Sequence, residues 1–586
     1  MFAVSTDDWG RTVSVPEADA AYYYSYLPSV ILDGDLDLTN QYAVTKNWYH
    51  LGETANGHAS NVFGVGPAVF QSPAFIVGHG LALLSGARTD GFSQWETWFV
   101  LWTSVPFSIG AVYLAARVAR RRIAASAVSD IAPLIAALAG PVCYYAIRQP
   151  GYAHPYATFC VAWLIERWDA SFDGVGPRSL RTWIGLGLAI GAASLARPQL
   201  AAWCVILLIA VIDDVRRRNE MSMSRLVARW AFGGLVALAV FSPQLFAWQI
   251  LYSSWYVVPQ GSGFMRWDSP AWTEVLFSSR NGLFPWAPLY LFFIAAVFWL
   301  RPRRLACGLI TGFALQTIVN GAAWDWWGGG SFGGRRFDSA YVVFALGAAF
   351  LIQRLVVLTQ NGLNRDNGLK SRLLGGFAAC CILLGICATS AEVALTATTS
   401  VTSARISGGT PASAVWRHRV WGPFGLVASV LSTIDTLPAD LAFMFMHKTS
   451  LDGYSRIVGV YSLGETFPGL NSYGDKKTDV VKFTDLDGPW FKGLAPETSR
   501  RARMNQGEAT ILIGLNRRGS IRVRLPVHGV GELTIRWNGT ALFHGEMTGH
   551  ELLELEANDV RRGVNALTVT APVSTTLDEI SLVAEP

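Results

Sequence analysis

Acidic and tyrosine side chains are concentrated near the start of the chain. Residues 16–40 read PEADAAYYYSYLPSVILDGDLDLTN, so Glu17 and Asp19 are shortly followed by Tyr22 and Tyr23. A carboxylate can serve as general base for an acceptor hydroxyl or amine, and tyrosine rings can stack on sugar rings. We identify both acids as candidate catalytic residues and both tyrosines as candidate sugar- or acceptor-binding residues. The competing interpretation of Asp19 is a solvated loop charge or a helix cap.

Basic side chains that suit a phosphate group occur farther along the chain. They are Arg197 in LARPQL, Arg280 in FSSRNGLFPW, Arg335 and Arg336 in GGGSFGGRRFDS, and His154 in RQPGYAHPYATF. The planar guanidinium group matches phosphate oxygens in pairs. The alternative for each arginine is an interfacial side chain that reaches anionic lipid. For the histidine, the alternative is a structural imidazole.

Tryptophan and glycine dominate residues 324–338. Trp324, Trp326 and Trp327 precede a run of glycines in this segment. Glycine permits close backbone approach, and such a loop can line a sugar pocket. The alternative is a belt of tryptophans at the membrane interface. We retain the three tryptophans as candidate sugar- or acceptor-binding residues.

The sequence lacks metal-binding and nucleotide-binding motifs. His50, His58 and His79 lack ligand spacing, and all seven cysteines fall inside apolar runs, which excludes CxxC zinc patterns. The sequence has neither a phosphate-binding loop nor a dinucleotide fingerprint. We therefore predict no metal site and no required cofactor, and leave a divalent metal open.

The composition indicates a membrane protein with water-soluble parts. Of 586 residues, 51% are hydrophobic and 15% are charged, against roughly 25% charged in soluble proteins. The net charge of +5 arises in residues 97–395, which hold 25 basic and 13 acidic side chains. Because these charges flank apolar runs, they do not indicate nucleic acid as a partner.

Ten apolar runs are long enough to be candidate membrane spans. They cover residues 97–117, 128–147, 151–168, 180–196, 199–213, 227–250, 284–300, 305–322, 338–358 and 373–394. If residues 1–96 lie outside, the inside loops collect 19 Lys and Arg and the outside loops collect six. The positive-inside rule then places both termini outside the membrane.

Two features of the first 96 residues bear on this topology. Residues 66–84 are apolar, but a span there would invert every later loop, so we predict helices on the outer membrane surface. An exported N-terminal segment normally follows a signal or helix, and Met1 opens directly into a polar segment. We therefore expect that a first transmembrane helix is missing from this chain.

The chain divides into four predicted regions. Residues 1–96 form a first extracytoplasmic loop with surface helices, and residues 97–395 form the transmembrane core. Residues 396–508 form a helical or irregular connector with an amphipathic stretch at 424–445. From 509 to 586 the hydrophobic period is two, in short segments separated by Gly, Asn and Asp, which predicts a small β-sandwich. The fold class is a mainly α, polytopic bundle with a C-terminal extracytoplasmic β-domain.

The order of these motifs resembles the GT-C superfamily of integral-membrane glycosyltransferases. Protein O-mannosyltransferases and the bacterial aminoarabinose transferase of lipid A belong to this superfamily. The resemblance covers roughly residues 15–395 and includes the acidic, Tyr-rich first loop, the surface helices and the segments GAASLARPQL, WDSPAWTEVLFSSRNGLFPWAPL and WDWWGGGSFGGRRF. The acids that usually stand side by side are separated here by Ala18, which leaves open whether Glu17 or Asp19 acts.

The resemblance implies an enzyme of the bacterial inner membrane. Its donor would be a polyprenyl-phosphate sugar, and its acceptor a cell-envelope glycan, lipid or protein on the extracytoplasmic face. Asp19 would be the base, the basic residues would bind the donor phosphate, and transfer would invert the anomeric carbon. Membrane lipids are the other expected partners. Two other classes are a lipid-linked sugar transporter or flippase, for which we find no repeat, and a non-catalytic membrane scaffold.

Overall fold

A computed structural model gives the structure of the chain. It describes residues 2–6, 12–123, 126–174, 176–218, 221–261, 263–267, 270–277, 282–323, 325–326, 328, 332–363, 373, 375–386, 389, 478–481, 491–498, 500–515, 519–560 and 563–584. The chain forms two compact units. The helical unit comprises Met1–Ser262, Trp286–Asn320 and Ser331–Ser400, and the second unit comprises Gly263–Pro285, Gly321–Gly330 and Val401–Pro586.

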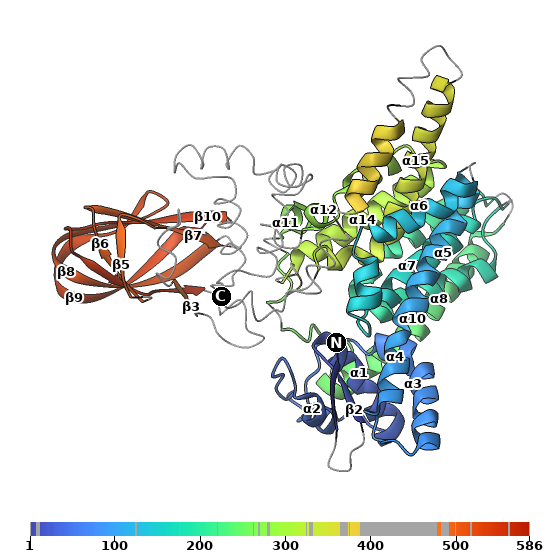
Figure 1. Cartoon of the computed structure of the whole chain (residues 1–586), viewed down its shortest axis with the longest axis horizontal. Coiled ribbons are helices and arrows are strands. Elements are labelled where there is room, and N and C mark those ends of the chain that lie inside the picture. Colours follow the sequence, from blue (N-terminus) through green and yellow to red (C-terminus); the bar gives the residue numbers. More distant parts are fainter. Residues whose placement is uncertain are drawn as a thin grey trace. The chain divides into compact units, whose positions relative to one another are not determined.

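Helices account for most of the first 363 residues (Figure 1). The α-helices are α1 (Asp19–Pro28), α2 (Thr39–Thr45), α3 (Gly66–Ser85), α4 (Gln94–Trp102), α5 (Ser104–Arg122), α6 (Ser126–Leu138), α7 (His154–Ala170), α8 (Leu180–Ala196), α9 (Val205–Arg216), α10 (Met223–Tyr252), α11 (Trp272–Phe277), α12 (Leu283–Trp286), α13 (Leu289–Val297), α14 (Arg303–Ala322) and α15 (Tyr341–Leu363). Shorter π- or 3₁₀-helical turns are η1 (Ser29–Asp33), η2 (Tyr144–Arg148), η3 (Pro198–Cys204) and η4 (Arg335–Ala340).

Each of the ten apolar runs coincides with helical structure, the last with residues 375–386. Among the described residues, six helices are long and apolar enough to cross a membrane. One of the six is α3, so length and composition do not separate this helix from the spans, and its surface placement stays a prediction. The mainly helical fold class is confirmed, whereas the number of spans is not fixed.

Small residues allow two of the long helices to approach closely. A Cβ atom added to Gly187 of α8 would lie 2.2 Å from the backbone oxygen of Gly233 in α10. One added to Gly191 would lie 2.6 Å from the backbone oxygen of Ala237. Close contacts of this kind between small residues are typical of membrane helices, and they fix α8 against α10.

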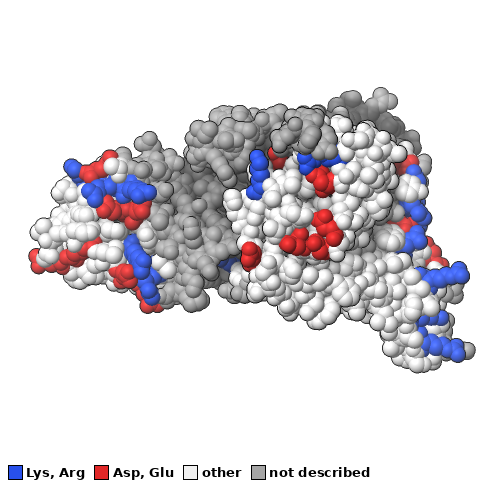
Figure 2. Space-filling view, turned by 90° about the horizontal axis from the view of Figure 1, so that it is seen from below, with Lys and Arg blue, Asp and Glu red and all other residues white. Residues whose placement is uncertain are grey.

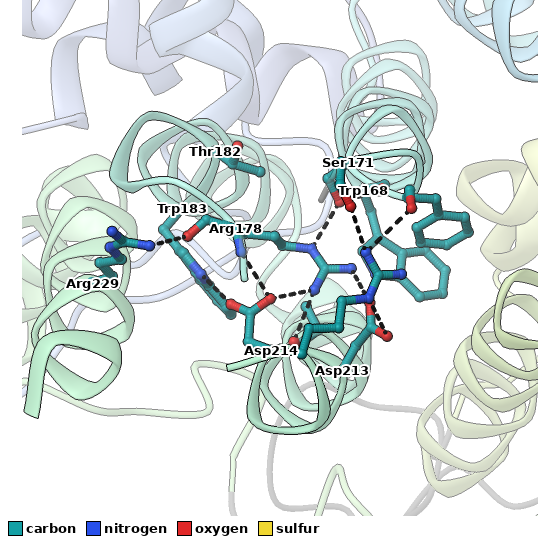
Figure 3. A network of polar contacts seen from close by, with 12 residues as sticks. Trp168, Ser171, Arg178, Thr182, Trp183, Asp213, Asp214 and Arg229 are labelled. Atoms are coloured by element: carbon teal, nitrogen blue, oxygen red, sulfur yellow. Dashed lines mark hydrogen bonds and ion pairs between the residues drawn. The ribbon is translucent and has the colours of Figure 1, made fainter. Parts of the chain in front are cut away.

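Buried ion pairs join helix ends on the side of the bundle that the sequence predicts to face the cytoplasm (Figure 3). The Arg178 guanidinium lies 2.7 Å from Asp214 and 2.8 Å from Asp213. The indole nitrogens of Trp183 and Trp230 donate to Asp214 at 2.9 and 3.3 Å. These contacts connect α8, α9 and α10, and the mutual attraction of the paired groups offsets part of the cost of burying their charges.

A second ion-pair cluster lies near the end of α7, where Arg121 and Arg122 of α5 bind Asp169 at 2.7 Å each. His154 begins the same helix, about 22 Å away at 1.5 Å of rise per residue. The predicted cytoplasmic and extracytoplasmic sides of the bundle therefore lie at opposite ends of α7. In Figure 2, basic side chains of the helical unit line one edge, while much of the face in view carries no charged groups.

The N-terminal segment folds against α3 and α4 at one end of the helical unit (Figure 1). Strands β1 (Phe2–Thr6) and β2 (Thr12–Pro16) form an antiparallel hairpin that the sequence reading did not predict. Tyrosines of α1 pack into a small core with Phe75 and Phe92. Tyr26 donates to the Phe63 backbone oxygen at 2.9 Å. This core holds α1 in a fixed position.

The second unit contains the predicted C-terminal β-domain. Its strands are β3 (Thr478–Val481), β4 (Phe491–Lys492), β5 (Leu494–Thr498), β6 (Arg501–Met504), β7 (Glu508–Leu515), β8 (Gly519–Trp537), β9 (Thr540–Val560), β10 (Gly563–Thr570), β11 (Thr576–Asp578) and β12 (Ile580–Ala584). They form a ten-stranded sheet with main order β4-β7-β10-β8-β11-β6-β5, to which β9, β12 and β3 are added through β8 and β12. Strands thus precede residue 509, the predicted start of the domain. The predicted helix at 424–445 lies outside the described residues.

Two of the predicted short strands merge into β8 and two more into β9, so this part of the strand prediction was wrong. The glycines were read as turns, yet pairing continues through Gly529↔Gly549 and Gly531↔Met547. Gly531 has φ 124°, and a Cβ there would lie 2.8 Å from Pro572. Glycine in a strand can mark a bend or a close approach instead of a turn, and both apply here.

Candidate functional site

Asp19 is placed by an unusual backbone turn at the start of α1. Ala18, just before the helix, has φ 53° and ψ −136°, a conformation that residues other than glycine rarely adopt. The chain thereby turns from β2 into α1, and the Asp19 side chain is 8% exposed. A carboxylate is favoured at a helix N-terminus by the helix dipole, but burial requires further partners.

Both oxygens of Asp19 have such partners. Nη2 of Arg335 lies 2.9 Å from Oδ2, and the Tyr49 hydroxyl donates to Oδ1 at 2.6 Å. The pair connects α1 to η4. The Asp19 carboxylate is therefore held between one guanidinium group and one hydroxyl group.

Tyr22 stacks against Tyr49 and holds it in place with a hydrogen bond. The two rings stack with centroids 5.3 Å apart, and the Tyr22 hydroxyl accepts from the Tyr49 backbone nitrogen at 2.6 Å and donates to Asn47 at 2.8 Å. Tyr22 is 1% exposed, and burial raises its pKa to about 12. It therefore positions the partner of Asp19, while stacking of a sugar on Tyr22 stays a prediction.

Tyr23 lies within the electrostatic reach of the acid and the arginines. Its pKa is raised to about 12, first by burial and second by the Asp19 carboxylate. The guanidinium groups of Arg197, Arg335 and Arg336 act in the opposite direction. The Tyr23 hydroxyl is therefore protonated at neutral pH and can donate a hydrogen bond.

Polar side chains of α14 fix the turn that carries the two adjacent arginines. Gln316 and Asn320 donate to the Arg336 backbone oxygen at 2.6 and 3.0 Å. Gln316 also donates to Ser339 at 2.8 Å and accepts from Trp203 at 2.9 Å. Because these amides are buried in an apolar helix, satisfying them strongly restricts the position of η4.

His154 and Arg197 meet a second buried acid, Asp338. His154 Nδ1 lies 2.7 Å from Asp338 Oδ2, and Arg197 Nη1 lies 3.6 Å from Oδ1. The Tyr145 ring stacks on the imidazole with centroids 4.1 Å apart. Residues from the starts of α7 and η3 are thus joined to η4, the element that also carries Arg335, the ion-pair partner of Asp19.

The structure brings together half of the residues predicted from sequence. Those in one cluster are Asp19, Tyr23, His154, Arg197, Arg335 and Arg336, with Tyr22 directly behind them. Glu17 is half-buried, and no hydrogen bond or ion pair joins it to this cluster within the described ranges. Trp326 is buried in the second unit. Arg280, Trp324 and Trp327 lie outside the described residues.

Sequence reasoning missed three members of the cluster. Asp338 stands two residues after the arginine pair, in a segment that was singled out for its tryptophans, glycines and arginines. Tyr49 and Tyr145 had no distinguishing pattern, since their contacts join segments far apart in the chain. The one signal in the sequence was the position of an acid, Asp338, two residues after a pair of arginines.

The cluster has the charge of an anion site. Among the described residues, three guanidinium groups and two carboxylates lie in the cluster. Within the part of the chain that the structure describes, no three His, Cys, Asp or Glu side chains are grouped to hold a metal. The arrangement combines a buried carboxylate with several guanidinium groups.

This combination defines a polytopic helical protein with an acid–arginine site at one end of its bundle. No protein-family model matches the sequence, and a comparison with curated proteins finds no match. Similar solved structures do exist. They are GT-C glycosyltransferases, the class that the sequence resembles.

Three of these structures illustrate the degree of likeness. ArnT from Cupriavidus metallidurans bound to undecaprenyl phosphate has 12% identity and a TM-score of 0.38, covering 74% of this chain and 76% of its own. The archaeal oligosaccharyltransferase AglB from Archaeoglobus fulgidus, with an inhibitory peptide and a dolichol-phosphate, has 10% identity and a TM-score of 0.40, covering 70% and 54%. Arabinosyltransferase EmbB from Mycobacterium smegmatis has 12% identity and a TM-score of 0.31, covering 97% and 63%. At these values the likeness carries no argument about the activity of this chain.

Proposed function

We propose that the chain is an inverting membrane glycosyltransferase that moves a sugar from a polyprenyl-phosphate donor to a cell-envelope acceptor on the extracytoplasmic face. The observation that carries the proposal is the buried Asp19–Arg335 pair, 2.9 Å apart, within a cluster that also holds Arg197, Arg336 and His154. A base candidate and a phosphate-binding set are thereby adjacent, as sugar transfer from a phosphate requires.

The arginines of the cluster suit the phosphate of the proposed donor. A sugar phosphodiester carries one negative charge, which guanidinium groups can bind in pairs of hydrogen bonds. When the bond from the anomeric carbon to the phosphate oxygen breaks, its electron pair stays on that oxygen and the phosphate gains a second negative charge. Arginines fixed beside this oxygen stabilise the charge as it develops.

Asp19 would accept the proton of the acceptor hydroxyl or amine as the new glycosidic bond forms. In the structure, Arg335 and Tyr49 occupy both of its oxygens. A donor phosphate would compete with Asp19 for Arg335, because the same guanidinium suits either anion. Donor binding would therefore release one Asp19 oxygen for the acceptor and couple the two binding steps.

The proposal is tested by supplying the purified, detergent-solubilised protein with radiolabelled polyprenyl-phosphate sugars of several types and with native membrane acceptors. Transfer of label to an acceptor, with inverted anomeric configuration in the product, supports it. Neither transfer nor binding of any donor would favour the transporter or scaffold alternatives. The sugar, pentose or hexose, is read directly from the donor that is consumed.

A further inference from the structure

Asp338 is a buried carboxylate with no role in the reaction as proposed above. Its side chain is 1% exposed, and that of His154 is 3% exposed. Oδ2 faces His154 Nδ1 at 2.7 Å, while Oδ1 accepts from the Ser339 backbone nitrogen at 2.7 Å. Asp338 thus has one oxygen fixed by the backbone of η4 and the other committed to the imidazole.

The distances determine where the imidazole proton lies. Two acceptor atoms 2.7 Å apart would repel, so a proton must stand between Asp338 and Nδ1 of His154. Arg197 Nη1 is 3.4 Å from the same nitrogen, and a protonated Nδ1 cannot accept a hydrogen bond from it. The remaining polar atom of this buried ring is Nε2, which makes no hydrogen bond to any residue that the structure describes.

The protonation state of Nε2 decides how it meets a phosphate. A neutral imidazole with its proton on Nδ1 presents a lone pair at Nε2, which repels a phosphate oxygen. A doubly protonated ring presents a donor there and adds a positive charge. Phosphate binding near His154 therefore favours uptake of a proton by Nε2.

Several groups around the ring bear on this equilibrium. The Asp338 carboxylate, 2.7 Å from Nδ1, stabilises an added positive charge on the ring, whereas the guanidinium groups of Arg197, 3.4 Å from the same nitrogen, and of Arg335 in the same cluster repel it. The Tyr145 and Tyr152 rings cover the imidazole at centroid distances of 4.1 and 6.1 Å. A bound phosphate would offset the two arginines, and Asp338 would then be the group that stabilises the added charge.

We propose that His154 takes up a proton from solvent when the donor phosphate binds, and that Asp338 is the positioning residue that holds Nδ1–H and balances the new charge. The inference rests on the proposed function, because the ligand is its donor phosphate. During transfer the imidazolium keeps its proton and hydrogen-bonds the departing phosphate, while the acceptor proton goes to Asp19. No other bond changes at His154.

Proton uptake can be measured directly by calorimetry on the full-length protein in detergent. The probe is undecaprenyl methyl phosphate, a phosphodiester whose own charge is constant from pH 5.5 to 8.5. Binding enthalpies at pH 7.5 are compared in two buffers of different ionisation enthalpy. We expect uptake of about one proton per ligand bound, with affinity weakening by up to about tenfold per pH unit at higher pH.

Variants distinguish His154 from other proton acceptors, including Asp19. Asp338→Asn and His154→Gln should each remove most of the proton uptake and flatten the pH profile of binding. The matched control is Glu96→Gln, because Glu96 is also buried and lies 2.7 Å from His79 Nδ1, outside the cluster. This control should retain wild-type proton uptake.

The outcomes separate this inference from the proposed function. If wild-type protein does not bind the phosphodiester, the proposed function fails. If it binds without proton uptake, or if His154→Gln retains the uptake, the proton-uptake inference is overturned while the donor site stands. Because His154→Gln tests the same proton, the result does not depend on folding of Asp338→Asn.

Discussion

Arg335 donates to the Asp19 carboxylate at 2.9 Å although the two residues are 316 positions apart in the sequence. The contact joins the first helix of the chain to the turn before α15. It unites the two segments in which the sequence places a candidate base and candidate phosphate ligands. The fold therefore brings these two segments into direct contact.

Breaking this ion pair from one side should destabilise the protein. Arg335→Gln would leave a buried carboxylate with one hydroxyl partner, which costs about 3–5 kcal/mol for fully buried pairs. Asp19→Asn in the same background removes the charge that was left unpaired, so the double variant should recover a large part of the loss. Chemical unfolding of the four proteins in detergent measures the coupling.

Additive effects of the two substitutions would contradict the pairing. Tyr49→Phe provides a control, because it removes only the hydrogen bond to the other Asp19 oxygen. Its cost should be about 1–2 kcal/mol.

Close packing of α8 on α10 predicts a sharp difference between neighbouring glycines. Gly187→Ala places a methyl group 2.2 Å from the Gly233 backbone oxygen, so the helices must separate, at a cost of about 1–3 kcal/mol. Gly234→Ala meets nothing within 4 Å and should be neutral or stabilising by up to about 1 kcal/mol. Thermal unfolding midpoints test both, and equal midpoints would be inconsistent with this packing.

The β-domain should lose stability in acid through Asp578. Hydrogen bonds from Arg501 lower the pKa of this carboxyl from its usual 3.8 to about 2, and His528 contributes. A lowered pKa in the folded state means that the stabilisation is complete above pH 3.8 and disappears as the pH falls toward 2. Because Asp578 is partly exposed, we expect a loss of about 1 kcal/mol.

Amide hydrogen exchange in β6 and β11, corrected for intrinsic rates, reports this loss between pH 5 and pH 2. Asp578→Asn should show the lower stability at both pH values. Glu532→Gln, on a largely exposed side chain, should behave like wild type. A wild-type domain with no change in protection across this range would refute the role of Asp578.

The helical core was predictable because a membrane imposes a simple pattern. Each apolar run of roughly the length that spans the hydrocarbon is helical in the structure. The long strands β8 and β9 could not be predicted, because Gly529 and Gly549 look like turn residues in the sequence. Only the pairing of Gly529 with Gly549 across the two strands shows that the hydrogen-bonded ladder continues.

The site was predictable in part for a similar reason. Arg197 and Arg335 interrupt apolar surroundings, where a charge is costly and therefore informative. The choice between Glu17 and Asp19 stayed open because the acids that usually stand side by side are separated here by Ala18. Burial and the contact with Arg335 distinguish Asp19, and such a contact between distant segments leaves no mark in a single sequence.

The most direct test of the account compares glycosyl transfer by wild type, Asp19→Asn and Glu17→Gln in the same donor and acceptor assay. Asp19→Asn preserves shape and should lower the transfer rate by about 10²–10⁴-fold, the usual contribution of a general base. Glu17→Gln should retain a rate within a few-fold of wild type. Unchanged transfer by a folded Asp19→Asn protein, or loss confined to Glu17→Gln, would contradict the assignment of Asp19 as the base.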